Sequence, residues 1–157
     1  SDKMKRYKAL WMLIGLFLCL AISGCGNSNE EAGFVDGYYT AIMSDYSFGW
    51  KEYVTICVMD NKIVSVEYNA RNKAGFIKSW DSAYMRNMNS VSGTYPNRYT
   101  RDYAAQLLET QGMAEIDMLA GASSSGGNFQ KMTAALLESA QIGDTEIQIV
   151  QSPEPEE

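Results

Sequence analysis

Histidine is absent from the 157-residue sequence, and this absence removes several classes of enzyme at once. Histidine is the most frequent general base in enzymes and the commonest metal ligand in proteins. A Ser-His-Asp or Cys-His hydrolase therefore cannot be built from this chain, and zinc catalysis is disfavoured. Cysteine and proline are also scarce, with three of each. The function has to rest on chemistry that needs neither histidine nor a cluster of cysteines.

The longest apolar run, residues 9–22, is too short to span a bilayer comfortably, because a membrane helix needs about 20 apolar residues. Lys5, Arg6 and Lys8 precede this run, and Ile22-Ser-Gly-Cys25 follows it. A cationic segment, an apolar segment and a small-residue cleavage site in this order are typical of a secretory signal peptide. Ile22-Ser-Gly-Cys25 resembles the lipobox of bacterial lipoproteins. There the cysteine is diacylated and the chain is cut before it.

The lipobox predicts residues 1–24 as a signal peptide and Cys25 as the lipidation site. Two acyl chains anchor a protein stably to a membrane, whereas one binds only marginally. We therefore expect the mature protein on the outer face of the bacterial cytoplasmic membrane, at the cell surface or in the periplasm. Residues 25–33 are small and polar and read as a tether. Residues 34–150 form the expected domain, and residues 151–157 an acidic, disordered tail.

The mature chain is strongly acidic. The leader holds four of the thirteen basic residues and one of the nineteen acidic residues, which leaves nine and eighteen, a net charge of −9. This charge argues against nucleic acid as a partner and against simple adsorption to anionic lipid. Cys19 leaves with the signal peptide and Cys25 is lipidated, so Cys57 has no partner for an internal disulfide.

Alternating apolar residues predict strands in the first half of the domain, at residues 34–43, 53–59 and 63–68. Val54, Ile56 and Val58 share one face of the second strand. Val64, Val66 and Tyr68 are expected to share a face of the third, and a turn at Asp60-Asn61 makes the two a hairpin. Residues 146–150 alternate briefly and are expected to add a last strand.

Three helical stripes follow, in which apolar residues recur every three or four positions. The first is Ile77, Trp80, Tyr84 and Met88, and the second contains Tyr103, Ala104, Leu107 and Leu108. The third is Phe129, Met132, Thr133, Leu136, Leu137 and Ala140. Gly112 and Gly143 are expected to end the second and third helices. The sequence thus predicts one α+β domain, a small antiparallel sheet with a hairpin, packed by about three helices.

Residues 117–129, Asp-Met-Leu-Ala-Gly-Ala-Ser-Ser-Ser-Gly-Gly-Asn-Phe, carry the only pattern that points to a ligand. Small residues and three hydroxyls run directly into the third helix, which we expect to begin near Gly126. The first amides of a helix lack intrahelical partners and carry partial positive charge, so this loop could cradle a phosphate. Loops of serine and glycine also commonly enter helices without binding anything, and the residues alone favour such a plain helix start, in which Ser124 or Ser125 is the N-cap.

Asp117-x-x-Ala120-Gly121-Ala122-Ser123 resembles the flavinylation motif of FMN-binding domains, Asp-x-x-(Ser/Thr)-Gly-Ala-(Thr/Ser). Ala120 stands where Ser or Thr is usual. Those domains occur in the C and G subunits of sodium-pumping and Rnf-type redox complexes and in flavoproteins of extracellular electron transfer. The resemblance covers roughly residues 34–143. It includes Asp36-Gly-Tyr-Tyr39, Gly49-Trp-Lys-Glu52 and Tyr95-Pro-Asn-x-Tyr-Thr100.

The resemblance implies that an FAD-dependent flavin transferase attaches FMN to Ser123 through a phosphoester. It also implies cofactor-binding roles for the rest of the loop: Asp117, Gly121, Ala122, Ser124, Ser125 and Gly126. The chain would then be an electron carrier rather than a turnover enzyme, with protein or quinone as redox partner. The flavin would supply the redox chemistry, with no catalytic residue and no metal. Trp80, Tyr84 and Tyr95 are candidates to cover the flavin ring, although aromatic residues at this spacing also build cores.

Two other functions fit the same residues. The chain could be a non-redox surface lipoprotein that binds free flavin or another phosphate-bearing ligand without a covalent bond. It could also be a purely structural surface lipoprotein. Two observations would separate these three functions: whether the exported protein carries a flavin, and whether that flavin stays with the protein when the protein is precipitated with acid.

Cys25→Ser should leave an uncleaved or soluble precursor, because no other cysteine follows a small-residue cleavage site at this distance from the apolar run. Metabolic labelling with a fatty acid measures this directly. The unsubstituted chain should take up label, and undiminished label in Cys25→Ser would show that lipid is attached elsewhere.

Overall fold

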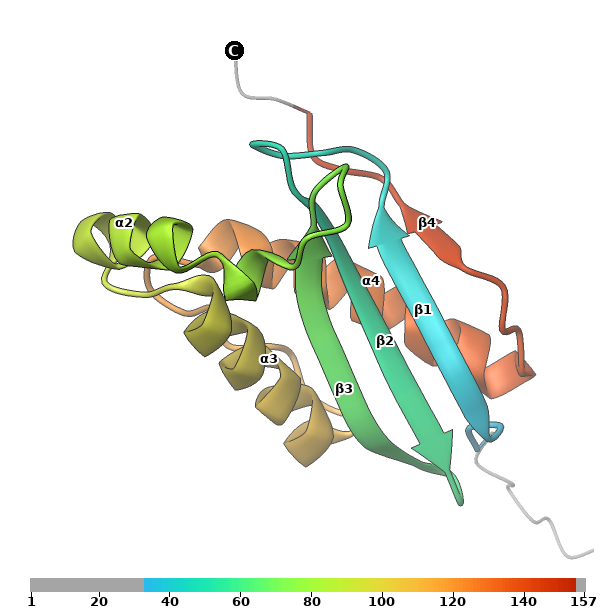
Figure 1. Cartoon of the computed structure of the whole chain (residues 1–157). Coiled ribbons are helices and arrows are strands. Elements are labelled where there is room, and N and C mark those ends of the chain that lie inside the picture. The colour runs from blue at the N-terminus through green and yellow to red at the C-terminus, as the bar shows by residue number, and fades with distance from the viewer. Residues whose placement is uncertain (1–32, 155–157) are drawn as a thin grey trace, which may run out of the picture. The chain divides into compact units, whose positions relative to one another are not determined.

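The computed structural model describes residues 33–154. The predicted signal peptide, the predicted lipidation site Cys25, the predicted tether up to residue 32 and residues 155–157 lie outside the described residues. Two helices pack on one face of a four-stranded sheet (Figure 1). The predicted α+β class is therefore confirmed. No helix within residues 33–154 combines the length and apolar character needed to cross a membrane.

The sheet contains β1 (Gly37–Met43), β2 (Lys51–Met59), β3 (Lys62–Arg71) and β4 (Gln148–Val150), in the spatial order β3-β2-β1-β4. β1, β2 and β3 are antiparallel neighbours, and the predicted hairpin turns at Asp60 and Asn61, both with positive φ. β4 pairs parallel to β1, so the sheet is mixed rather than purely antiparallel. The chain reaches β4 only after a long helix, and such a crossover permits parallel pairing where a tight hairpin does not.

The predicted face of β3 is wrong at Val64. Cys57 pairs with Ser65 and Val58 with Ile63, so Val64 is an extra residue in a β-bulge. The bulge shifts the side-chain alternation by one position. Val64 is consequently exposed, and Ile63 takes the buried place beside Val58. Tyr68 stays buried, as predicted.

The helical elements are a 3₁₀ turn, η2 (Lys78–Trp80), and three α-helices, α2 (Ser82–Ser92), α3 (Pro96–Thr110) and α4 (Ser123–Ile142). The prediction that Ile77 and Trp80 share a helical face with Tyr84 is wrong. Ile77 pairs with Arg71 at the end of the sheet, and Trp80 belongs to η2. α2 begins later because the Asp81 side chain accepts the Tyr84 amide hydrogen at 2.9 Å and so caps the helix.

The ends of the two longer helices were largely predictable. α4 ends at Gly143, which adopts a left-handed conformation with φ 72°, as predicted. α3 ends one residue earlier than expected, because Gln111 is its C-cap with φ 56°, and Gly112 follows it with φ 79°. The Gln111 side chain bonds both backbone groups of Ile63, which ties this helix end to β3.

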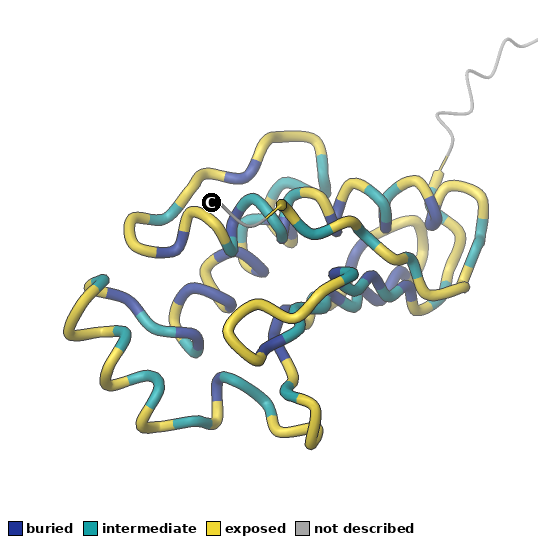
Figure 2. Tube along the Cα trace, turned by 90° about the horizontal axis from the view of Figure 1, so that it is seen from above, coloured by how far each residue is buried: buried dark blue, intermediate teal, exposed yellow. Residues whose placement is uncertain are grey.

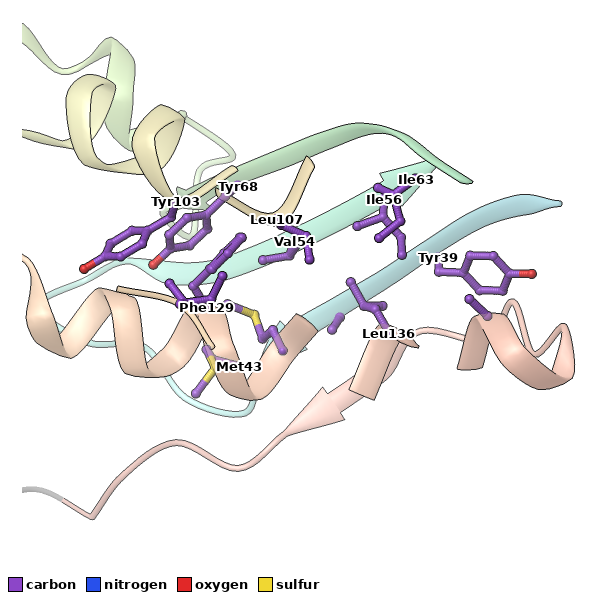
Figure 3. Close-up of a cluster of buried hydrophobic side chains, with 14 of the residues drawn as sticks. Tyr39, Met43, Val54, Ile56, Ile63, Tyr68, Tyr103, Leu107, Phe129 and Leu136 are labelled. Atoms are coloured by element: carbon purple, nitrogen blue, oxygen red, sulfur yellow. The ribbon is translucent and has the colours of Figure 1, made fainter. Parts of the chain in front are cut away.

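The core lies between the sheet and the facing sides of α3 and α4, and the outer turns are exposed (Figure 2). The predicted stripe of α4 is buried at Phe129, Met132, Thr133, Leu136 and Ala140. The larger of these side chains meet Val54, Ile56 and Leu107 from across the core (Figure 3). Cys57, in β2, is a buried free thiol.

The ordered chain continues past the predicted domain end at residue 150. The Ser152 amide donates to Ser44 Oγ at 2.9 Å, and the Asp45 amide donates to Ser152 Oγ at 3.0 Å. These two bonds fix the segment after β4 beside the loop that joins β1 and β2.

The domain should fold without metal or disulfide, because its core is apolar and its one described cysteine is unpaired. Residues 33–154 should melt in a single cooperative transition, with the same midpoint in buffer, EDTA and reductant. Circular dichroism during heating measures this. Loss of the transition under either treatment would reveal a missed crosslink or metal.

Candidate functional site

The segment that resembles the flavinylation motif lies between α3 and α4 and is held to α3 by its backbone. The Gln106 side chain accepts the Asp117 amide hydrogen at 2.7 Å and donates to the Asp117 carbonyl at 3.1 Å. Asp117 itself is exposed, and its carboxylate has no hydrogen bond among the described residues. The fold therefore fixes the main chain at Asp117 and leaves the carboxylate available to a partner.

The buried Tyr103 hydroxyl makes a second attachment. It donates to the Ala122 carbonyl at 2.8 Å and accepts the Leu119 amide hydrogen at 3.0 Å. One side chain of α3 thus satisfies two backbone groups on either side of Ala120 and Gly121. Each such bond stabilises a fold by about 1 kcal/mol, and more where the group would otherwise be buried unpaired.

Gly121 and Gly126 are required by the packing of the chain against itself. Gly121 has φ 79°, and a Cβ there would overlap the Ser92 carbonyl oxygen at the end of α2. A Cβ at Gly126 would overlap the Tyr103 hydroxyl and the Met118 sulfur. Gly127 is different, because no atom lies within 4 Å of its Cβ position. At Gly121 and Gly126, protein atoms thus make the close approach to the backbone that the absence of a side chain allows.

α4 begins at Ser123, three residues before the position predicted from the sequence. Ala122 is the N-cap and supplies no side-chain hydrogen bond, so Ser124 and Ser125 are not caps. The amides of Ser123, Ser124 and Ser125 have no acceptor among the described residues, and the first turn contains no acidic residue. This 20-residue helix thus presents three unpaired N–H groups at its positive end.

The three serines differ in their surroundings. Ser123 and Ser124 are exposed, whereas Ser125 is half-buried. Ser125 Oγ donates to Glu52 Oε1 at 2.8 Å, and Asn128 Nδ2 donates to Glu52 Oε2 at 2.7 Å. The Tyr68 hydroxyl lies 3.1 Å from Glu52 Oε1 and 2.9 Å from the Ser125 carbonyl oxygen. Glu52 therefore joins β2 and β3 to the first turns of α4.

Three side chains near Glu52, those of Tyr68, Tyr99 and Lys78, have raised pKa values. Burial, and then the charge of Glu52, raise the pKa of Tyr68 well above its usual value. Burial also raises the pKa of Tyr99, which the nearby Lys78 partly opposes. Burial alone would lower the pKa of Lys78, but the phenols of Tyr99 and Tyr84 and the Glu52 carboxylate raise it overall. Lys78 consequently stays a cation, and Tyr68 and Tyr99 stay neutral, around physiological pH.

Sequence reasoning missed Glu52, Tyr68, Asn128 and Lys78 as neighbours of the motif. The aromatic candidates are dispersed: Trp80 is 76% exposed on η2, and Tyr95 is the half-buried N-cap of α3. Tyr84 packs edge-on against Trp50, with 6.1 Å between ring centroids, and Lys78 lies 4.7 Å from its ring centre. Of the three candidates, Tyr84 is thus the one that contacts Lys78, the cation whose pKa Glu52 helps to raise. The described residues contain no group of three or more acidic or thiol side chains placed to hold a metal.

Comparison with known proteins places the chain among lipoproteins. It is 34% identical over 132 residues to the 15 kDa lipoprotein of Treponema pallidum (strain Nichols), which covers 82% of this chain and 91% of that protein. The chain belongs to the family of that lipoprotein. Its fold matches the crystal structure of CPE2226 protein from Clostridium perfringens, with TM-score 0.72, 33% identity, and coverage of 76% of this chain and 99% of that one. No family model matches the sequence.

The two adjacent glycines of α4 provide a matched test of the packing. Gly126→Ala should lower the free energy of unfolding by about 1–3 kcal/mol, because the methyl group would displace Tyr103 from the motif segment. Gly127→Ala should raise it by up to about 1 kcal/mol, because the space is open and alanine is the better helix former. Urea denaturation of both variants measures the difference. Equal effects would show that Tyr103 does not constrain Gly126.

Proposed function

We propose that this lipoprotein is a membrane-anchored, extracytoplasmic flavoprotein that carries FMN on Ser123 and shuttles electrons. The observation that carries the proposal is the exposed Ser123 hydroxyl at the first position of α4, inside the segment that resembles the flavinylation motif. An acceptor hydroxyl has to be reachable by a second protein. Its phosphoester then has to meet groups that favour a negative charge.

The residues at the start of α4 suit a phosphate. The unpaired amides of Ser123 to Ser125 and the exposed Ser124 hydroxyl are donors, and the helix dipole adds partial positive charge. Gly121 and Gly126 would serve indirectly, by allowing the chain to pack tightly behind the site. Asp117, with its carboxylate exposed, is suited to recognition by the transferase.

The attachment balances with FAD as the only co-reactant. The Ser123 oxygen attacks the phosphorus of the FMN half of FAD, and a P–O bond to serine forms. The phosphoanhydride bond breaks, AMP leaves with the electron pair, and the hydroxyl proton passes to a base of the transferase. When bound, the flavin supplies the electron transfer, so the chain itself needs no acid or base. An anchored carrier of this kind would exchange electrons with a protein or a quinone at the membrane.

Ala120 favours a second candidate function. Where the motif usually has a hydroxyl residue, the chain has an exposed methyl group, and one possible hydrogen bond to the phosphate or the transferase is missing. The start of α4 could then hold free flavin or another phosphate-bearing ligand without a covalent bond.

Ser123→Ala should abolish covalent flavin and leave the melting temperature unchanged, because an exposed side chain at the helix start carries little packing. Ser123→Thr should retain the modification, and Ser124→Ala, which removes the neighbouring exposed hydroxyl, should retain it with at most a smaller effect. Intact mass and peptide mapping, after coexpression with a flavin transferase, measure the result. Undiminished modification of Ser123→Ala would refute the assignment, and flavin lost on acid precipitation of the unsubstituted protein would support the non-covalent function.

A further inference from the structure

We propose that Glu52 determines whether Ser123 or Ser125 accepts the flavin, because it encloses Ser125 and turns Ser123 toward solvent. This inference rests on the proposed function. Glu52 is the second residue of β2 and lies more than seventy positions from the run, so nothing in the local sequence indicates the contact.

Glu52 holds the first two turns of α4 at two points. Its two oxygens accept separate hydrogen bonds, from Ser125 at 2.8 Å and from Asn128 at 2.7 Å. Bonds to a carboxylate are among the stronger hydrogen bonds in proteins. Asn128 follows Ser125 by three residues, so both side chains project from the same side of the helix. Two contacts on one side fix the rotation of the helix about its own axis.

That rotation decides where Ser123 points. Each residue of an α-helix turns the side-chain direction by about 100°, so Ser123 is rotated by about 200° from Ser125. When Ser125 faces Glu52 and the sheet, Ser123 faces away from both. The burial agrees, because Ser125 is half-buried while Ser123 is exposed. The helix therefore offers the Ser123 oxygen to a second protein.

The same contact with Glu52 keeps the Ser125 hydroxyl from reacting with FAD. Its hydroxyl hydrogen is directed at Glu52, and its carbonyl lies 2.9 Å from the Tyr68 hydroxyl, so the residue is enclosed on the sheet side. FAD is an anion, and its phosphorus would have to approach Ser125 beside a carboxylate. Glu52 thus opposes attack at Ser125 both sterically and electrostatically.

The test is the position of the flavin in Glu52 variants of the mature chain, treated with purified flavin transferase and FAD. Glu52→Val and Glu52→Ala remove the acceptor, and valine also suits a strand. We expect flavin on both Ser123 and Ser125 in these variants and on Ser123 alone in the unsubstituted protein. Glu52→Gln should keep Ser123 alone, because its amide oxygen still accepts the Ser125 hydroxyl. Glu138→Gln, on the exposed side of α4, is the matched control.

Circular dichroism identifies which variants are folded, and one folded variant without an acceptor at position 52 suffices. Flavin found only on Ser123 in that variant, whether the modification is fast or slow, would overturn the inference and leave the proposed function intact. Flavin on Ser125 in the unsubstituted protein, lost on removal of Glu52, would also overturn it, since Glu52 would then activate Ser125. No flavin on any serine of the unsubstituted protein would refute the proposed function itself.

Discussion

The pair of hydrogen bonds at the Tyr103 hydroxyl is the constraint on which the candidate site depends. Tyr103 is fully buried, and its ring lies 5.7 Å from that of Phe129 and 6.3 Å from that of Tyr68. These rings come from α3, α4 and β3, so one aromatic cluster brings three elements together. The Tyr103 hydroxyl in this cluster bonds the Ala122 carbonyl and the Leu119 amide. The core thereby sets the place where α4 starts.

The start of α4 is unusual in lacking the groups that normally complete a helix end. Ala122 has no side chain able to cap, and no acidic residue stands in the first turn. Three amides remain without acceptors in the described structure, and the stability of the helix comes from the buried stripe further along it. Glu52 adds negative charge near this positive end from the sheet, but it binds side chains and leaves the amides free.

Sequence reasoning succeeded where a single local pattern determines the outcome. The hairpin at Asp60-Asn61, the stripe of α4 and the end at Gly143 each depend on neighbours a few residues apart. It failed at Val64 because a bulge changes the alternation without altering composition. Sequence reasoning also placed Ile77 in a helix, because the spacing of apolar residues contains no information about a bridge to Arg71 at the end of the sheet.

The candidate site shows the same division. The motif segment and Ser123 were identified from the sequence, whereas the predicted start of α4 was three residues late. Serine is a common N-cap, so the sequence favoured Ser124 or Ser125 over an alanine. The actual boundary follows from the bond between Tyr103 and Ala122, across nineteen positions, and no local pattern contains that information.

The site also separates recognition from stability, residue by residue. The protein holds the motif segment through backbone groups: the amide and carbonyl of Asp117, the amide of Leu119 and the carbonyl of Ala122. The side chains of Asp117, Ala120 and Ser123 remain exposed and unused by the fold. Substitutions at these three positions should therefore leave the core intact, and under the proposed function they would alter recognition by the transferase. Gly121 and Gly126 have the opposite character, since any side chain there meets protein atoms. The fold consequently tolerates alanine at position 120, where the side chain is exposed.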